Sequence, residues 1–200
     1  KKKFALPSLL NVKALPISLG MFFIMIAYGA IVVFVSIYAE QKDFSNIASF
    51  FACFSATIFL SRLFAGRLFD HGHIFLLILG GLTLAAVGLV WLGYAESPFQ
   101  FLVAGMICGF GFGVLMPTGQ AAINNLVESS ERGGANSTYL FSYDLGVGIG
   151  SLVIGFLLDR ISMGAVYRYS ALLIAVSAGI FVVKAIPHYL HNRQDRGVTS

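Results

Sequence analysis

Asp144 lies well inside a long apolar stretch of the chain, where an ionised carboxylate is costly. On membrane-insertion scales, an aspartate at the centre of a spanning helix costs about 2.5–3.5 kcal/mol. Such a group is expected to face the interior of a helix bundle or a water-filled cavity. Two interpretations are open. The carboxylate either exchanges protons or contacts a cationic group, or it is a structural hydrogen-bond partner of a neighbouring helix.

Further polar and amphipathic side chains lie in other apolar stretches. Gln120 and Asn124 are four residues apart and therefore share one face of a helix. Pro117 removes a backbone hydrogen bond just before them and favours a kink. Their shared face either lines a cavity or makes hydrogen bonds between helices. Tyr28 and Tyr143 each combine an apolar ring with a polar tip, and such groups can stack on an organic substrate.

A cation and a turn motif follow one another at the end of one apolar stretch. Arg62 lies near this end, and the motif Gly-x-Leu-x-Asp, from Gly66 to Asp70, closes the stretch. The long side chain of Arg62 either extends to the membrane surface or pairs with Asp70 or Glu128. The same motif closes a later stretch and ends at Asp159.

The elements that position these residues are expected to be membrane-spanning helices. Hydrophobic residues make up 58% of the 200 residues and charged residues 11%, whereas a soluble domain contains about 25% charged residues. The apolar stretches reach the ~20 residues that a helix needs to cross a bilayer, and they lack the alternation of membrane strands. We therefore expect an all-α polytopic membrane bundle over residues 1–200. Its expected spans are roughly 15–39, 44–68, 74–95, 98–127, 137–158 and 163–187.

The repeated motif closes the second and the fifth expected spans, which cross the membrane in opposite directions. The first three spans and the last three are therefore expected to form a 3+3 inverted repeat, an arrangement that recurs in secondary transporters. Glycines also recur every fourth residue, at Gly105, Gly109 and Gly113 and again at Gly146 and Gly150. This spacing predicts close contact between helices.

Charge and histidine placement limit the possible functions. Lys and Arg are concentrated near the span ends on the side of the two termini, which predicts cytoplasmic termini in the plasma membrane. This orientation accounts for the net charge of +4, and no nucleic-acid partner is expected. The histidines lie at span ends, so neither a metal site nor a Ser–His catalytic pair is expected within the membrane. No nucleotide-binding loop is present. We expect neither an enzyme nor a cofactor.

The segment from Ser61 to His73 resembles the loop signature of the major facilitator superfamily. That signature is a Gly-x-Leu-x-Asp-Arg-x-Gly-Arg-Arg stretch between helices 2 and 3, repeated more weakly between helices 8 and 9. The loop here is one residue shorter, and His71 and His73 stand where Arg or Lys is usual. Six spans after a basic lead-in resemble the C-terminal half of such a transporter. Residues 110–113 and 142–150 resemble helices 10 and 11 of drug/proton antiporters.

The resemblance implies alternating access, in which this bundle rocks against an N-terminal six-helix half of the same longer chain. We expect proton-coupled efflux of a small organic solute across the lipid bilayer. The alternative is a half-size or truncated membrane subunit with a packing or binding role and no autonomous transport. The candidate proton-coupling and substrate residues are Asp144, Tyr143, Gln120, Asn124 and Tyr28, and the candidate gating residues are Arg62, Gly66, Asp70 and Asp159.

Overall fold

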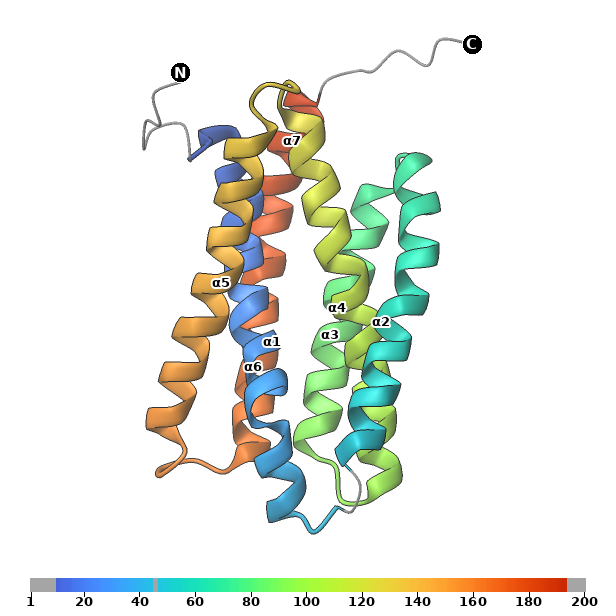
Figure 1. The fold of residues 1–200 in the computed structure, drawn as a ribbon, viewed down its shortest axis with the longest axis vertical. Helices are drawn as coiled ribbons and strands as arrows, with labels where there is room; N and C mark the ends of the chain where they lie inside the picture. The colour runs from blue at the N-terminus through green and yellow to red at the C-terminus, as the bar shows by residue number, and fades with distance from the viewer. Residues whose placement is uncertain (1–9, 45–46, 194–200) are drawn as a thin grey trace.

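Six long helices dominate the computed structural model, which describes residues 10–44 and 47–193 but not the side chain of Asp70 (Figure 1). Within these residues there is no strand, and all six helices are long and apolar enough to cross a membrane. The expected all-α, six-span fold is confirmed. The helices are α1 (Leu15–Gln41), α2 (Ile47–Asp70), α3 (Ile74–Gly93), α4 (Pro98–Leu126), α5 (Arg132–Leu157) and α6 (Met163–Ile180).

The start of α5 differs from the sequence-based expectation. The helix begins at Arg132 rather than at residue 137 and therefore includes two consecutive glycines. The hydroxyls of Ser137 and Thr138 donate hydrogen bonds of 2.9 Å to the carbonyls of Gly133 and Gly134. These bonds satisfy the two hydroxyls within their own helix, whose first turn includes the glycine pair although glycine has a low intrinsic helix propensity.

The last helical rod also extends further than expected. After α6, the chain continues without a break through a π-helical turn, η3 (Phe181–Ala185), into α7 (Ile186–Asn192). Pro187 lies in the first turn of α7 and has no backbone N–H to donate. A widened turn just before a proline lets the rod continue without the regular hydrogen bond, so the rod runs past residue 187.

A short lead-in before α1 joins three elements at one end of the bundle. It contains the 3-10 turn η2 (Val12–Ala14). Lys13 Nζ donates to the carboxylate of Glu131 at 3.1 Å, and the carbonyl of Lys13 lies 3.1 Å from Nε2 of His188 in α7. The hydrogen bond from Lys13, and a second from the backbone N–H of Glu128, lower the pKa of Glu131. The carboxylate therefore stays ionised at neutral pH, and this contact is lost only as pH falls below the ordinary value of 4.5.

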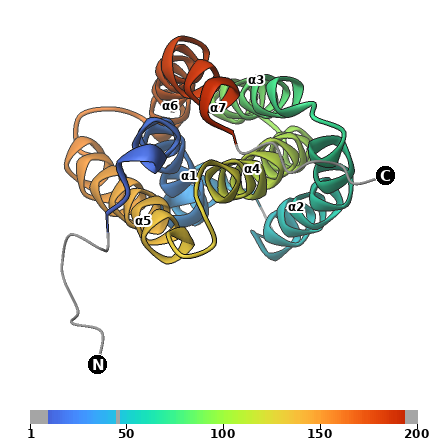
Figure 2. The same ribbon diagram turned by 90° about the horizontal axis from the view of Figure 1, so that it is seen from above.

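The helices pack as two equivalent trios of opposite direction, α1 with α5 and α6 and α4 with α2 and α3, so each trio contains helices from both sequence repeats, α1–α3 and α4–α6. In addition, α3 contacts α6. Exchanging α1 with α4, α2 with α5 and α3 with α6 reproduces this set of contacts. Figure 1 shows that α1 and α4 run in opposite directions, as the predicted inverted repeat requires. In Figure 2, α2 and α5 lie on one side of the α1–α4 pair, and α3 and α6 lie on the other.

Glycines allow the closest helix contacts in both trios. A Cβ atom on Gly109 of α4 would lie 2.5 Å from the carbonyl oxygen of Phe54 in α2. In the second trio, a Cβ on Gly146 of α5 would lie 2.6 Å from the carbonyl oxygen of Phe22 in α1. Both distances are to backbone atoms, which cannot move aside as a flexible side chain can. The seams α4–α2 and α1–α5 therefore depend on the absence of side chains, as the four-residue spacing predicts.

Gly109→Ala is expected to destabilise the protein by about 1–3 kcal/mol, the usual cost of overpacking a tight contact. The measurement is the thermal unfolding midpoint of the full-length protein in detergent. Gly179→Ala is the matched control, because a Cβ at Gly179 of α6 would meet no atom within 4 Å and α6 lies on the other side of the bundle from α2 and α5. Equal midpoints for the two variants would contradict the proposed role of the seam.

Candidate functional site

Tyr28 and Tyr143 come together from α1 and α5, with aromatic and sulfur groups of α4 beside them. The ring centroids of the two tyrosines are 6.2 Å apart at an interplanar angle of 57°. Tyr28 also meets Phe112 edge to face at 5.3 Å. The hydroxyl of Tyr143 lies 3.8 Å from the sulfur of Met116. Two predicted substrate residues therefore form one aromatic cluster, defined here as Tyr28, Tyr143 and Phe112.

Asp144 follows Tyr143 directly and is exposed at the surface of the bundle. Within the described part of the chain, its carboxylate has no hydrogen-bond or ion-pair partner. The interpretation of Asp144 as a hydrogen-bond partner of a neighbouring helix is therefore not realised within this bundle. Its position beside the aromatic cluster is compatible with the other interpretation, a carboxylate available to a proton or a cation.

Gln120 and Asn124 are joined by a residue that the sequence interpretation did not select. Asn136 of α5 accepts a hydrogen bond from Gln120 Nε2 at 3.2 Å and donates to Asn124 Oδ1 at 2.7 Å. The side-chain amide of Asn136 thus connects the polar face of α4 to the first turn of α5. It was missed because residues before 137 were expected to form a loop. A predicted start of α5 before residue 136 would have placed the amide of Asn136 opposite those of Gln120 and Asn124.

The gating candidates on α2 do not form the ionic network with Glu128 that the sequence made possible. Arg62 is exposed at the surface of the bundle. Arg62 makes no ion pair with Glu128 in the structure, so this pairing, considered from the sequence, is not formed. The alternative pairing with Asp70 involves a side chain that lies outside the described part.

Gly66 and Asp159 occupy opposite ends of the bundle. A small cavity of about 170 Å³ separates the last turns of α2 from the proline region of α4, and Gly66 and Pro117 both line it. Nothing lies within 4 Å of a Cβ placed on Gly66, so α2 is loosely packed there. Asp159 lies in the turn after α5 and is exposed. The predicted gating residues are therefore not brought together, and an outward role for Asp159 stays a prediction.

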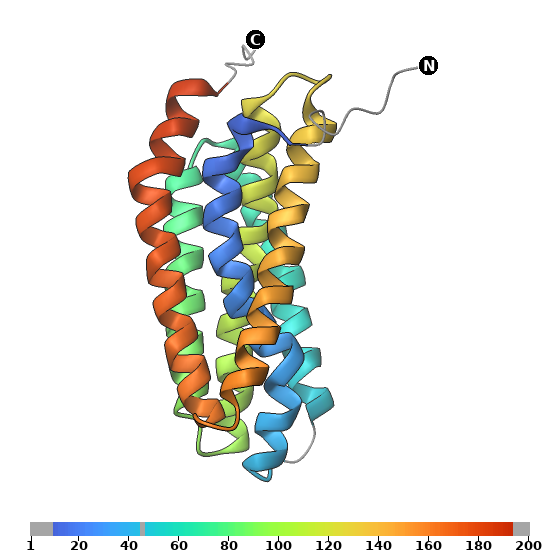
Figure 3. The ribbon, with the colours of Figure 1, turned by 90° about the vertical axis from the view of Figure 1, so that its left-hand side faces the viewer.

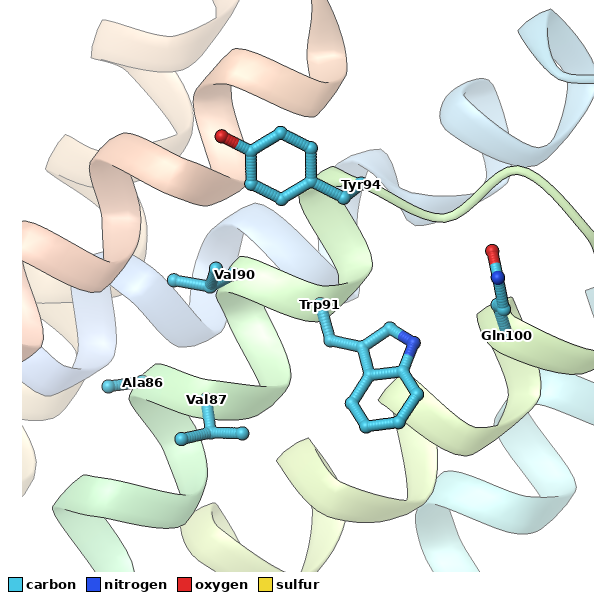
Figure 4. Close-up of a pocket in the computed structure, with 6 residues that line it drawn as sticks. All are labelled: Ala86, Val87, Val90, Trp91, Tyr94 and Gln100. Atoms are coloured by element: carbon cyan, nitrogen blue, oxygen red, sulfur yellow. The ribbon is translucent and has the colours of Figure 1, made fainter.

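A shallow groove of about 570 Å³ on α3 is separate from these residues (Figure 4). Its lining is almost entirely apolar, with Val87, Val90 and the ring of Trp91 along one helix face. Tyr94 at its edge has the guanidinium of Arg168 over its ring at 4.6 Å. Aromatic side chains at the end of a spanning helix are typical of a membrane–water interface. We therefore assign the polar chemistry to the aromatic cluster and not to this groove.

Comparison with known proteins identifies the family. The chain matches the Major Facilitator Superfamily over residues 17–198. It is 28% identical over 185 residues to uncharacterized MFS-type transporters of Burkholderia mallei (strain SAVP1) and Burkholderia pseudomallei (strain K96243), covering 92% of this chain and 44% of each relative. It is 25% identical over 181 residues to one from Pseudomonas aeruginosa (strain LESB58), covering 90% of this chain and 44% of the relative.

The chain belongs to the Major Facilitator Superfamily, and the family resemblance read from the sequence is confirmed. It spans less than half the length of the curated relatives that it matches, which is consistent with one six-helix half of the fold. The family and the six apolar helices make it a multi-pass membrane protein of a transporter family, and they favour a transporter over an enzyme.

Asn136→Ala is expected to lower the stability of the full-length protein by about 1 kcal/mol, because two interhelical bonds of roughly 0.6 kcal/mol each are lost. The measurement is thermal unfolding in detergent. Ser137→Ala is the control, because the Ser137 hydroxyl bonds only to Gly133 of its own helix. An unfolding midpoint for Asn136→Ala that matches the control would show that the amide bridge contributes nothing.

Proposed function

We propose that this bundle is the C-terminal half of a secondary transporter that exports a small organic solute in exchange for protons. The observation that carries the proposal is the position of Asp144. It is an exposed carboxylate without a partner in the described part of the chain, and it lies directly beside an aromatic cluster. A spanning helix keeps such a group only where it faces water or another protein surface, because hydrocarbon contact is costly.

The poorly covered faces of α2 and α5 support a second six-helix half as the partner. Within the most apolar stretch of α2 and of α5, 17% of the residues are buried in the bundle. The corresponding share is 56% in α1 and in α4. Since α2 and α5 lie on the same side of the α1–α4 pair, a partner placed there would enclose the face between them (Figure 2). That face would contain Tyr28, Tyr143 and Asp144. Substrate and protons would then pass between the two halves by alternating access.

The proposed chemistry at this face is divided between the groups. Asp144 would bind and release the coupling proton, and the rings of Tyr28 and Tyr143 would contact the apolar part of the solute. Gln120 and Asn124 would keep the polar face of α4 in register with α5 through Asn136. Arg62, Gly66 and Asp70 would control access on one side of the membrane, and Asp159 on the other. We place both termini in the cytoplasm and the protein in the plasma membrane, as the distribution of Lys and Arg favours.

Asp144→Asn in the full-length protein is expected to reduce proton-driven transport to the level of empty vesicles, because the amide cannot carry the coupling proton. Solute exchange in the absence of a proton gradient should persist, since the amide keeps the shape of the carboxylate. The measurement is uptake into vesicles with an imposed pH gradient, using solutes that the unmodified protein is first shown to move.

Glu96→Gln is the control for loss of a carboxylate, because Glu96 is exposed in the connection between α3 and α4. This variant should keep pH-dependent transport. If Asp144→Asn also keeps it, Asp144 is not the coupling group. If the unmodified full-length protein moves no solute under any gradient, the alternative of a non-transporting subunit is favoured.

A further inference from the structure

An apolar groove of about 380 Å³ lies between α1 and α5, apart from the aromatic cluster. Figure 3 shows the side of the bundle on which α1 lies between α5 and α6. The groove is lined by α1 through Leu19 and Phe22, and by α5 through Phe141 and Leu145. Neither Tyr143 nor Asp144 contributes to it. The groove therefore uses a different face of α5 from the one that carries the proposed transport chemistry.

Ser18 places a buried hydroxyl without a partner in this otherwise apolar groove. Ser18 is 2% exposed, and its Oγ makes no hydrogen bond in the structure. The other two hydroxyls of the groove are satisfied within α5. Ser142 donates to the carbonyl of Tyr139 at 2.7 Å, and Thr138 donates to the carbonyl of Gly134 at 2.9 Å. A buried donor left unpaired costs about 1–3 kcal/mol, so an acceptor that enters the groove would remove this cost.

The depth of Ser18 restricts what that acceptor can be. Ser18 lies in the first turn of α1, which begins at Leu15, close to the ion pair between Lys13 and Glu131. The first turn of a full-length span lies near the boundary between hydrocarbon and headgroups. The ester carbonyls of glycerophospholipids lie at this boundary. They accept hydrogen bonds but donate none, and each is attached to an acyl chain that fits an apolar groove.

We propose that the groove between α1 and α5 binds one ester-linked glycerophospholipid of the bilayer. Ser18 donates its hydroxyl hydrogen to an ester carbonyl oxygen, and the attached acyl chain lies along Leu19, Phe22 and Leu145. Ser18 is a buried residue of the groove lining, and rotation about its χ1 angle, which has three staggered wells, brings the hydroxyl toward an acceptor that enters. The proposal does not depend on the direction or coupling of transport.

The hydrogen bond is tested by comparing ester-linked and ether-linked phospholipids with the same headgroup and chain lengths, because the ether linkage has no carbonyl. Each lipid is added to the delipidated full-length protein in detergent, and bound lipid is counted by native mass spectrometry. The unmodified protein should prefer the ester lipid about fivefold, the ratio expected for one typical hydrogen bond. Ser18→Ala should bind both lipids equally.

Ser142→Ala is the control for removing a groove hydroxyl, because the Ser142 hydroxyl already has an acceptor in α5. It should keep the ester preference. An unmodified protein without that preference, or a Ser18→Ala variant that keeps it, would overturn the assigned contact.

The groove itself is tested by filling it. Leu145→Trp should release the retained phospholipid, whereas Leu152→Trp should keep it, because Leu152 is exposed on α5 but does not line the groove. Thermal unfolding checks that both variants are folded, and Ser18→Ala serves as the test if Leu145→Trp is not. Retention of lipid by folded Leu145→Trp would refute the proposal. Dissociation of another protein segment by this variant would refute it too, since the groove would then be a protein interface.

Discussion

Backbone contact at glycine is the constraint on which this structure depends. Within a bilayer, helices gain little from the hydrophobic effect by associating, because lipid tails are as apolar as their side chains. Association must come from close packing, and the seams α4–α2 and α1–α5 achieve it where Gly109 and Gly146 meet backbone carbonyl oxygens. The same solution appears in both trios.

The seams also determine where polar chemistry is exposed. α1 and α4 are largely covered within their trios, whereas α2 and α5 contact the bundle along one face only. Tyr28 and Tyr143 therefore meet at the edge of the α1–α5 seam, and Asp144 lies just beyond it with no partner in the described part of the chain. The α1–α5 seam thus lies on one side of this face and the unpaired carboxylate of Asp144 on the other. This arrangement suits a face that opens and closes against a second six-helix half.

Much of the fold could be predicted from the sequence, because bilayer thickness sets the length of an apolar stretch and glycine spacing reports helix contact. The start of α5 could not, since the low helix propensity of Gly133 and Gly134 suggests a loop at this position. That single difference concealed Asn136. The pairing of Arg62 was also undecided, because helix position fixes where a long side chain starts but not where it ends.

Other features could not be predicted because they depend on how neighbouring helices are rotated about their axes. The approach of Tyr28 to Tyr143 depends on how α1 and α5 turn about their axes, which periodicity alone does not provide. The unpaired state of Ser18 depends on the same rotation, because that rotation decides which groups of α5 share the groove with its hydroxyl. In the sequence, Ser18 is an unremarkable polar residue at a span end.

The account is tested most directly by water access to Asp144. In the full-length protein freed of other cysteines, Asp144→Cys is compared with Val176→Cys, an exposed position within the α6 span. The measurement is the rate of reaction with a charged, water-soluble thiosulfonate reagent in membranes. If the face beside the aromatic cluster borders a water-filled path and α6 borders lipid, the first cysteine reacts rapidly and the second does not. Equal rates at the two positions would contradict the central claim.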